Sequence, residues 1–338
     1  MHPIELDGLT KRYGDVRGVE DLSLTVREGE VFGFLGPNGA GKTTTIRTLM
    51  GFQSPTAGTA TVLGADVRDA AALRAARANV GYLPSEPGFD ERVTGRRLLR
   101  YHGALRGDVR SETLLETFDP PLDRPVGDYS RGNRQMLAIV LAFMHDPDLV
   151  IMDEPTAGLD PLKQERFLSF VRAERARGKT FFFSSHVLGE VRKVCDRVGI
   201  VRDGRLAALE DVDDLLHRSG KAVRVEIAEP IEADAFALDG AHDVTVDGGG
   251  PEPGTAGAEE APGAAGGTAT AGATVSFTYT GRYEPLLRHL LGYEVVDLTV
   301  EEAPLEEVFM RFYDDGVAAS PEPAAGTGAL GDGDGGGP

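Results

Sequence analysis

A glycine-rich stretch with one lysine is the part of this sequence best suited to bind phosphate. It follows the apolar run 31–35, opens a segment of helical character, and reads Gly36-Pro37-Asn38-Gly39-Ala40-Gly41-Lys42-Thr43-Thr44. Glycines at this spacing let successive backbone N–H groups turn inward around a β-phosphate, and the ammonium group of Lys42 reaches the β- and γ-phosphates. Thr43 is placed to hold Mg²⁺, and the N-terminus of the following helix faces the same anion.

Two adjacent carboxylates end a second apolar run, which reads Leu149-Val150-Ile151-Met152-Asp153-Glu154. A fully buried parallel strand delivers such side chains to the carboxyl edge of its sheet, where the phosphate loop also lies. We expect Asp153 to hold the Mg²⁺ shell and Glu154 to polarise a water that attacks the γ-phosphate. For one such run alone, a strand that meets an acidic loop is the common alternative.

Tyr13 and His186 are candidate nucleotide contacts because of where they lie. The β-rich run 180–184 ends at Ser185-His186, on the same predicted sheet edge, so we expect His186 to contact the γ-phosphate. Tyr13 precedes the phosphate loop, and its ring can stack on an adenine face with a gain of roughly 1 kcal/mol or more. Taken alone, Tyr13 is better explained as an ordinary strand-end tyrosine.

Hydrophobic periodicity predicts the elements that must position these residues. Strands are predicted over 4–6, 22–26, 31–35, 59–63, 80–83, 149–154 and 180–184, and helices over 43–51 and 70–78. A hairpin over Asp203-Gly204 is predicted to join strands 197–201 and 205–209. Residues 86–145 are polar with a helical pattern, which indicates a helical subdomain inserted into an α/β fold.

One further motif makes this pattern specific. The stretch Tyr129-Ser130-Arg131-Gly132-Asn133-Arg134-Gln135 begins a helix just upstream of the acidic strand. Together with the residues above, it resembles the signature motif of ATP-binding-cassette (ABC) ATPases. Residues 1–218 are similar to the nucleotide-binding subunit of an ABC transporter, a P-loop NTPase cassette with a mixed sheet core. In this resemblance Tyr13 is the A-loop aromatic, 36–44 is Walker A, 149–154 is Walker B, 157–160 is the D-loop and His186 is the switch histidine.

The resemblance implies an ATPase that uses ATP and Mg²⁺, with Glu154 and His186 as catalytic residues. In the family, Ser130 and Gly132 of one subunit face the γ-phosphate of ATP on the other, and Asp160 belongs to the same shared site. The resemblance therefore implies a second ABC subunit, which forms a homodimer with the first in the ATP-bound state. It also implies a separate transmembrane permease through which export occurs. The chain is then expected in the cytoplasm, peripheral at the inner face of the plasma membrane, with membrane contact only through that partner.

Two positions depart from the family pattern. The Q-loop glutamine is expected near Ser85, where the chain reads Tyr82-Leu83-Pro84-Ser85-Glu86-Pro87, and Glu86 is a candidate substitute. The signature carries Arg131 and Asn133 where Gly and Gln are commonest, as in exporter-type branches of the family.

Composition excludes several other functions. The formal net charge of −19 argues against a nucleic-acid surface, which needs clustered Lys and Arg. No Asn-Lys-x-Asp motif for reading guanine occurs, which disfavours a GTPase. The alternative is a soluble cassette ATPase acting on the ribosome or DNA, which would usually show two cassettes or a long coiled coil.

The N-terminus shows no secretory signal, and the single Cys195 allows no intramolecular disulfide. The transported substrate is not encoded in these residues.

The last third of the chain is predicted to form a small accessory α+β domain over 219–313. Strands are expected over 223–227, 275–279 and 294–298, and helices over 285–291 and 305–313. Residues 247–274 are almost all Gly, Ala, Pro, Glu and Thr, which predicts a disordered insertion, and 314–338 has the character of a disordered tail. The segment 301–309 resembles the C-terminal ends of cassette subunits of drug and antibiotic exporters. For the accessory domain, a dimer-stabilising or solubilising role without substrate contact is the alternative.

We predict that Ser85→Gln leaves the ATP affinity within about twofold, as expected for a surface substitution, but changes how strongly the permease stimulates turnover. The reason is that this loop is the expected point of coupling to the membrane partner. ATPase rates measured with and without the native permease test this. An unchanged stimulation ratio would remove Ser85 from the coupling.

Overall fold

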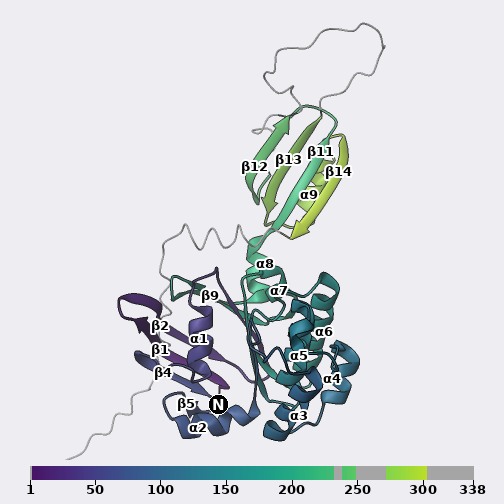
Figure 1. The fold of residues 1–338 in the computed structure, drawn as a ribbon. Coiled ribbons are helices and arrows are strands. Elements are labelled where there is room, and N and C mark those ends of the chain that lie inside the picture. The colour runs from purple at the N-terminus through teal and green to yellow at the C-terminus, as the bar shows by residue number, and fades with distance from the viewer. Residues whose placement is uncertain (1, 232–237, 249–271, 303–338) are drawn as a thin grey trace, which may run out of the picture.

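The larger part of the chain is built on a six-stranded sheet with the order β10-β9-β3-β8-β7-β6 (Figure 1). The computed structural model describes residues 2–231, 238–248 and 272–302. Neighbouring strands from β9 to β6 are parallel, and β10 is antiparallel to β9. The strands are β3 (Val31–Leu35), β6 (Val80–Leu83), β7 (Leu149–Asp153), β8 (Thr180–Ser185), β9 (Arg197–Arg202) and β10 (Arg205–Asp211). Every residue of β3, β7 and β8 is buried, as expected for strands covered on both faces.

A smaller antiparallel sheet with the order β2-β1-β4-β5 lies beside it. Its strands are β1 (Ile4–Tyr13), β2 (Val16–Val26), β4 (Ala57–Val62) and β5 (Ala65–Asp66). The prediction ended the first strand at Leu6 and was wrong, because β1 continues to Tyr13, which pairs with Val16. Register shifts on both sides of Leu9 break the apolar alternation that marks a strand in the sequence.

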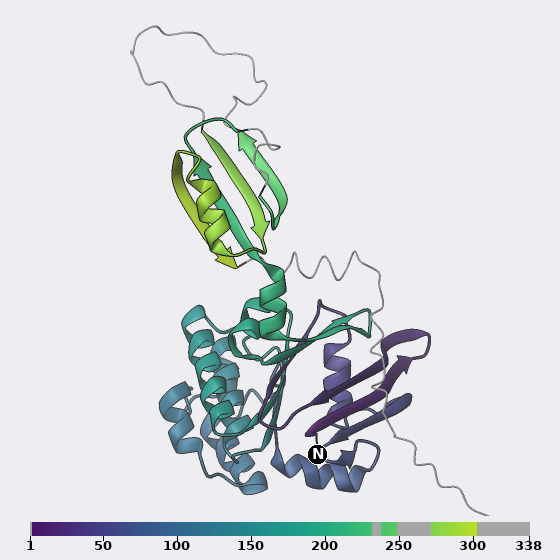
Figure 2. The same ribbon diagram turned by 180° about the vertical axis from the view of Figure 1, so that it is seen from behind.

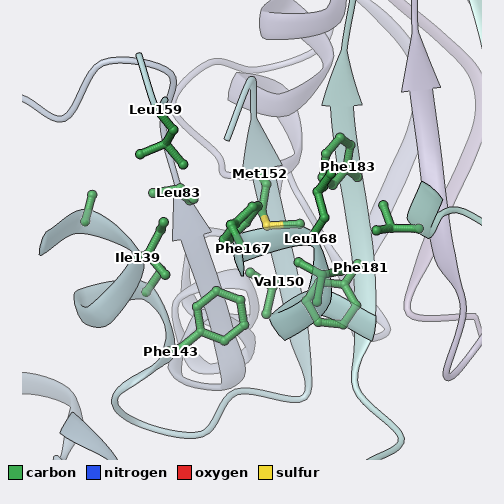
Figure 3. Packing of buried hydrophobic residues seen from close by; sticks show 14 of the residues in the cluster. Leu83, Ile139, Phe143, Val150, Met152, Leu159, Phe167, Leu168, Phe181 and Phe183 are labelled. Carbon is green, nitrogen blue, oxygen red and sulfur yellow. The ribbon is translucent and has the colours of Figure 1, made fainter. Parts of the chain in front are cut away.

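Two hydrophobic clusters pack on opposite faces of the central strands. In β8, Phe181 and Phe183 belong to one cluster and Phe182 to the other, as the period of two along a strand requires. Figure 3 shows Phe181 and Phe183 on the same side as Phe143 and Phe167, which come from two covering helices. Burial of each such ring stabilises the fold by about 1.5–3 kcal/mol.

The larger part of the chain has helices in each region where the sequence predicts them, and two further helices, over 161–176 and 188–194, were not predicted. They are α1 (Lys42–Leu49), α2 (Ala70–Ala76), α3 (Gly95–Arg106), α4 (Ser111–Phe118), α5 (Arg131–Phe143), α6 (Pro161–Ala176), α7 (Leu188–Val194) and α8 (Val212–Ser219), with 3-10 turns η1 (Arg77–Asn79) and η2 (Val126–Asp128). Helices α3, α4 and α5 fall between β6 and β7, within the predicted helical subdomain. None of the helices in the described ranges combines the length and the apolar character that crossing a membrane requires.

The predicted hairpin between β9 and β10 is confirmed, and its tip supports the phosphate loop. Asp203 and Gly204 have φ of 49° and 78°, the left-handed pair of a two-residue hairpin turn. The Gly204 N–H donates to the Ala40 carbonyl at 3.1 Å, and the Gly204 carbonyl accepts from the Glu20 N–H at 2.7 Å. The tip therefore links the loop to β2.

The last part of the described chain forms a four-stranded antiparallel sheet with the order β12-β13-β11-β14. Its elements are β11 (Lys221–Ile227), β12 (Ala241–Gly248), β13 (Ala273–Tyr279), α9 (Tyr283–Leu290) and β14 (Val295–Glu302). Figure 2 shows α9 on one face of this sheet. There Leu286 and Leu290 pack with Val225, Val275 and Phe277 in a core that is separate from the two cassette clusters.

Two predictions for this region need correction. The strand β12 was not expected, and residues 247–248 and 273–274 belong to strands rather than to the predicted disordered insertion. As an edge strand, β12 has no fully buried residue among 241–247, so its sequence lacks the apolar alternation of an inner strand. The rest of the predicted insertion, 249–271, lies outside the described residues, as do the predicted helix 305–313 and the tail 314–338.

We predict that replacing 249–272 with Asn-Gly keeps ATPase activity near the wild-type rate and keeps or raises the thermal midpoint. Gly248 pairs with Ala273, so a two-residue turn can close this hairpin. A shorter loop also costs less closure entropy, by about 0.6 kcal/mol for each halving of its length. Thermal unfolding and ATPase assays test this. A midpoint lowered by more than about 5 °C, equivalent to roughly 1 kcal/mol or more, would show that the removed segment packs.

Candidate active site

The phosphate loop connects β3 to α1 through a path that only glycine can follow at two positions. A Cβ on Gly36 would lie 2.4 Å from the Val201 carbonyl oxygen. Gly41 has φ of +103°, and a Cβ there would lie 2.7 Å from the Gly18 carbonyl oxygen. Gly41 is also the N-cap of α1 and has no side chain to cap the first-turn amides. These N–H groups and the positive end of the helix dipole are therefore free for an anion.

Lys42 places its ammonium group at the centre of this loop. Its Nζ donates to the Gly36 carbonyl at 2.6 Å and to the Pro37 carbonyl at 3.2 Å, and it lies 3.2 Å from Glu154 Oε1. The side chain is only 6% exposed, so the charge is held among oxygen atoms and away from bulk water. A buried cation with oxygen partners of this kind is well placed to exchange them for phosphate oxygens.

The end of β7 brings two carboxylates to this loop. Asp153 accepts from the Thr43 hydroxyl at 3.0 Å through Oδ2 and from the Ser184 hydroxyl at 2.7 Å through Oδ1. The next residue, Glu154, has φ of +49°, which turns its side chain away from the strand direction. Its Oε2 lies 2.6 Å from Nδ1 of His186, which is half exposed. The structure thus joins Lys42, Glu154 and His186 in one contact chain.

Tyr13 lies at the entrance to the same loop. Its side chain is 46% exposed, and its ring passes over Gly18, where an added Cβ would lie 2.9 Å from the ring. That same Cβ would lie 3.0 Å from the side chain of Thr44, in the first turn of α1. An exposed ring beside the phosphate loop is available to stack on a base.

Two residues of the predicted signature, Gly132 and Gln135, approach the segment that follows Glu154. Ser130 is the N-cap of α5 and accepts from the Asn133 N–H at 3.2 Å. Gly132 is buried, and a Cβ on it would lie 3.1 Å from the Gly158 carbonyl oxygen. The buried Gln135 donates from Nε2 to the Pro155 carbonyl at 2.8 Å. The N-terminus of α5 is therefore fastened to residues 155–158.

Asp160 ends that segment and caps the next helix. It accepts from the Lys163 N–H at 3.0 Å, and its carboxylate pairs with the Lys163 ammonium at 3.1 Å. These hydrogen bonds and the nearby charge lower the pKa of the Asp160 carboxyl below its usual value. Asp160 is therefore ionised at neutral pH, and its side chain is exposed.

Ser85 and Glu86, the two candidates at the Q-loop position, line a pocket of about 530 Å³. Its other side is formed by the signature helix, including Arg131, Arg134 and Gln135. Among the described residues, neither side chain forms a hydrogen bond with Asp153, whose partners are Thr43 and Ser184. Ser85 and Glu86 therefore border the signature helix across this pocket.

Sequence reasoning missed Ser184 and the contact between Arg131 and Gly158. Ser184 pairs in register with Asp153 in the neighbouring strand, and this pairing depends on a strand order and register that the two apolar runs do not specify. Arg131 lies against Gly158, whose φ is +81°, and a Cβ on Gly158 would lie 2.6 Å from both Cγ and Cδ of Arg131. No sequence pattern shows this contact, because it joins two segments through packing alone.

Comparisons with known proteins show which proteins this chain resembles. A family model described as ABC transporter matches residues 19–157. Nod factor export ATP-binding protein I of Burkholderia lata is 34% identical over 317 residues, which cover 91% of this chain and 96% of that protein. Bacitracin transport ATP-binding protein BcrA of Enterococcus faecalis is 34% identical over 232 residues, which cover 67% of this chain and 75% of that protein.

Solved structures share the fold of the larger part of the chain. An ATP-binding subunit of an ABC transporter superposes with a TM-score of 0.59 and 30% identity, over 64% of this chain and 92% of that one. A dimeric ATP-binding cassette bound to ADP and Pi superposes with a TM-score of 0.55 and 21% identity, over 62% of this chain and 98% of that one. The mixed α/β core predicted from the sequence is therefore confirmed.

We predict that Gly158→Ala lowers the ATPase rate more than Gly178→Ala does. Both glycines have left-handed φ, +81° and +90°, so each alanine costs about 1–2 kcal/mol of backbone strain. Only at Gly158 does the new methyl group meet Arg131, since Gly178 has open space around it. The double variant Arg131→Ala/Gly158→Ala should recover the part of the loss that comes from the clash.

ATPase rates and thermal midpoints of the four proteins separate the two effects. Equal rates for Gly158→Ala and Gly178→Ala would show that the Arg131 contact has no role in turnover.

Proposed function

This chain belongs to the ABC transporter family as an ATP-binding subunit whose ATP hydrolysis is coupled to transport, and we propose that it powers export through a separately encoded transmembrane permease. The observation that carries the proposal is the contact chain from Lys42 through Glu154 to His186, beside the Thr43–Asp153 pair. Two relatives with 34% identity are named for Nod factor export and for bacitracin transport, and the first name supports outward movement of the cargo.

In the proposed site, the triphosphate of ATP occupies the loop 36–41 and the first turn of α1. Backbone N–H groups surround the β-phosphate, and Lys42 exchanges its carbonyl and carboxylate partners for phosphate oxygens. Tyr13 stacks on the adenine at the mouth of the loop. Thr44, next to the Tyr13 ring, lines the path between base and phosphates.

Thr43 and Asp153 form the proposed magnesium site. A hydroxyl oxygen and a carboxylate oxygen that lie 3.0 Å apart are hard ligands of the kind Mg²⁺ prefers. When bound, the ion neutralises charge on the β- and γ-phosphates. Ser184 keeps the Asp153 carboxylate in place by its hydrogen bond of 2.7 Å.

Glu154 is the proposed general base for the attacking water. Its carboxylate lies between Lys42 and His186. When Lys42 turns to the phosphate oxygens, the contact with His186 Nδ1 keeps the carboxylate beside the γ-phosphate position. His186 holds one carboxylate oxygen through Nδ1 and presents the rest of its half-exposed ring to the phosphate. The two residues thus orient one water and one phosphate together.

Ser130, Gly132 and Asp160 serve a second subunit in this proposal. Ser130 and Asp160 are exposed, and Gly132 lies close to the Gly158 carbonyl in the segment that follows Glu154. The Ser130 hydroxyl and the amides of the α5 N-terminus then complete the γ-phosphate site of the partner subunit. Two copies close head to tail around two ATP molecules, and hydrolysis releases them.

The proposed location is peripheral, at the cytoplasmic face of the plasma membrane, with the permease as the membrane contact. The formal net charge of −19 opposes nucleic acid as a partner. Because Ser85 and Glu86 line an open pocket beside the signature helix, this face is the proposed route by which the permease senses the nucleotide.

We predict that Glu154→Gln lowers the hydrolysis rate by about two orders of magnitude or more, because it keeps the size of the side chain and removes the base. ATP affinity is retained, so the variant should accumulate as an ATP-bound dimer, whereas ADP should leave it monomeric. Adding Ser130→Arg should abolish this dimer, since bulk and charge then fill the opposing phosphate site. Light scattering with ATP and with ADP measures both effects.

Glu112→Gln is a matched control, because it makes the same chemical change at an exposed residue of α4. It should hydrolyse ATP at the wild-type rate and form no stable dimer. Wild-type hydrolysis by Glu154→Gln, or a dimer that survives Ser130→Arg, would sink the shared-site mechanism.

A further inference from the structure

The ring of Tyr13 is held by a side chain that none of the predicted motifs contains. Gln53 lies in the turn that follows α1, and its Oε1 accepts a hydrogen bond from the Tyr13 hydroxyl at 2.6 Å. This is a direct contact between the end of β1 and the far end of the helix that the phosphate loop begins. Gln53 is half-buried, and its bond to the Tyr13 hydroxyl lies at the exposed end of the side chain.

The other end of the same amide is bound to α1. Gln53 Nε2 donates to the Thr44 carbonyl at 2.7 Å and to the Thr48 hydroxyl at 3.1 Å. The Thr48 hydroxyl itself donates to the Thr44 carbonyl at 2.9 Å, so it is free to accept from Nε2. Both hydrogens of the amide nitrogen are used on α1, which leaves its oxygen for Tyr13.

These partners fix the orientation of the amide. A carbonyl oxygen can only accept, so the nitrogen of Gln53 must face Thr44 and the oxygen must face Tyr13. A glutamate at this position would set a carboxylate against the Thr44 carbonyl. Glutamine is thus the side chain that connects an acceptor on the helix to a donor on the ring.

We infer that Gln53 is a positioning residue for the nucleotide, which sets the Tyr13 ring at a fixed place relative to the phosphate loop. The inference rests on the proposed stacking of Tyr13 on adenine. In ATP the base and the triphosphate are joined through one ribose, so a ring and a loop that are already in register bind both ends with less loss of freedom. Gln53 supplies this register because it contacts the ring and the first turn of α1 together.

Lys11 supports the ring from another direction and does not replace this bond. Its Nζ lies 5.4 Å from the centre of the Tyr13 ring and donates to the Ser54 carbonyl at 2.8 Å. A cation above a ring face restricts the ring only weakly when exposed. The directional contact at the hydroxyl is the one that Gln53 makes.

The test is a double-variant cycle with Tyr13→Phe, Gln53→Leu and both together. Each single variant should raise the Kd and the KM for ATP about 3- to 10-fold, the value of one lost hydrogen bond, and kcat should change by less than KM. The double variant should bind ATP no more weakly than either single one, because both remove the same bond. Tripolyphosphate, which has no base, should bind all four proteins within about twofold if α1 is undamaged.

Tyr101→Phe is the matched control, since it deletes the hydroxyl of an exposed tyrosine on α3. It should leave the Kd for ATP unchanged. The chain contains no tryptophan, so Tyr13→Trp adds a single fluorophore at the ring position. Its emission should change with ATP and not with tripolyphosphate.

Additive losses in the double variant, or an equal weakening of tripolyphosphate, would overturn the role of Gln53 while leaving ATP binding by the chain intact. A wild-type chain that binds neither ATP nor tripolyphosphate would instead overturn the proposed function itself.

Discussion

The parallel register of β3, β8 and β7 is the constraint on which the site depends. Asp153 pairs with Ser184, Leu35 pairs with Ser185, and the Gly36 N–H continues the ladder to the Ser185 carbonyl at 3.3 Å. All three strands are buried along their whole length, so a slip by one residue would move their apolar side chains to the wrong face. The same register that fills the core therefore places the phosphate loop and both carboxylates at one edge.

Close approaches of backbone to backbone then hold the loops that leave this edge. The tip of the β9–β10 hairpin bonds to Ala40, and the first glycine of the phosphate loop touches the Val201 carbonyl. On the other side, residues 155–158 fasten the N-terminus of α5 through Gln135 and Gly132. The site is thus built from one rigid sheet edge and several loops, of which the signature loop is tied to the residues after Glu154.

The C-terminal sheet contributes to none of these contacts among the described residues. Its core is separate, with Val225, Val275 and Leu286 at its centre. The relative from Burkholderia lata aligns over 91% of this chain, so the alignment extends beyond the cassette part of the fold. This sheet therefore has a hydrophobic core of its own, apart from the residues of the proposed site.

The sequence alone determined the glycine-rich loop, the acidic strand end and the order along the chain of the strands that form the six-stranded sheet. Local patterns specify these features, because glycine spacing and continuous apolar runs carry their meaning within a few residues. It misjudged the length of β1 and missed β12, since bulges and an edge position remove the alternation on which strand prediction depends.

Only the tertiary structure decided which distant side chains meet. The Gln53 amide reaches Tyr13 across 40 residues, and Ser184 reaches Asp153 across 31. Arg131 meets Gly158 in the same way. Each contact depends on strand order, register and the direction in which a turn leaves a helix. Strand order, register and turn direction are set by the packing of all core residues together, so no single position in the sequence predicts them.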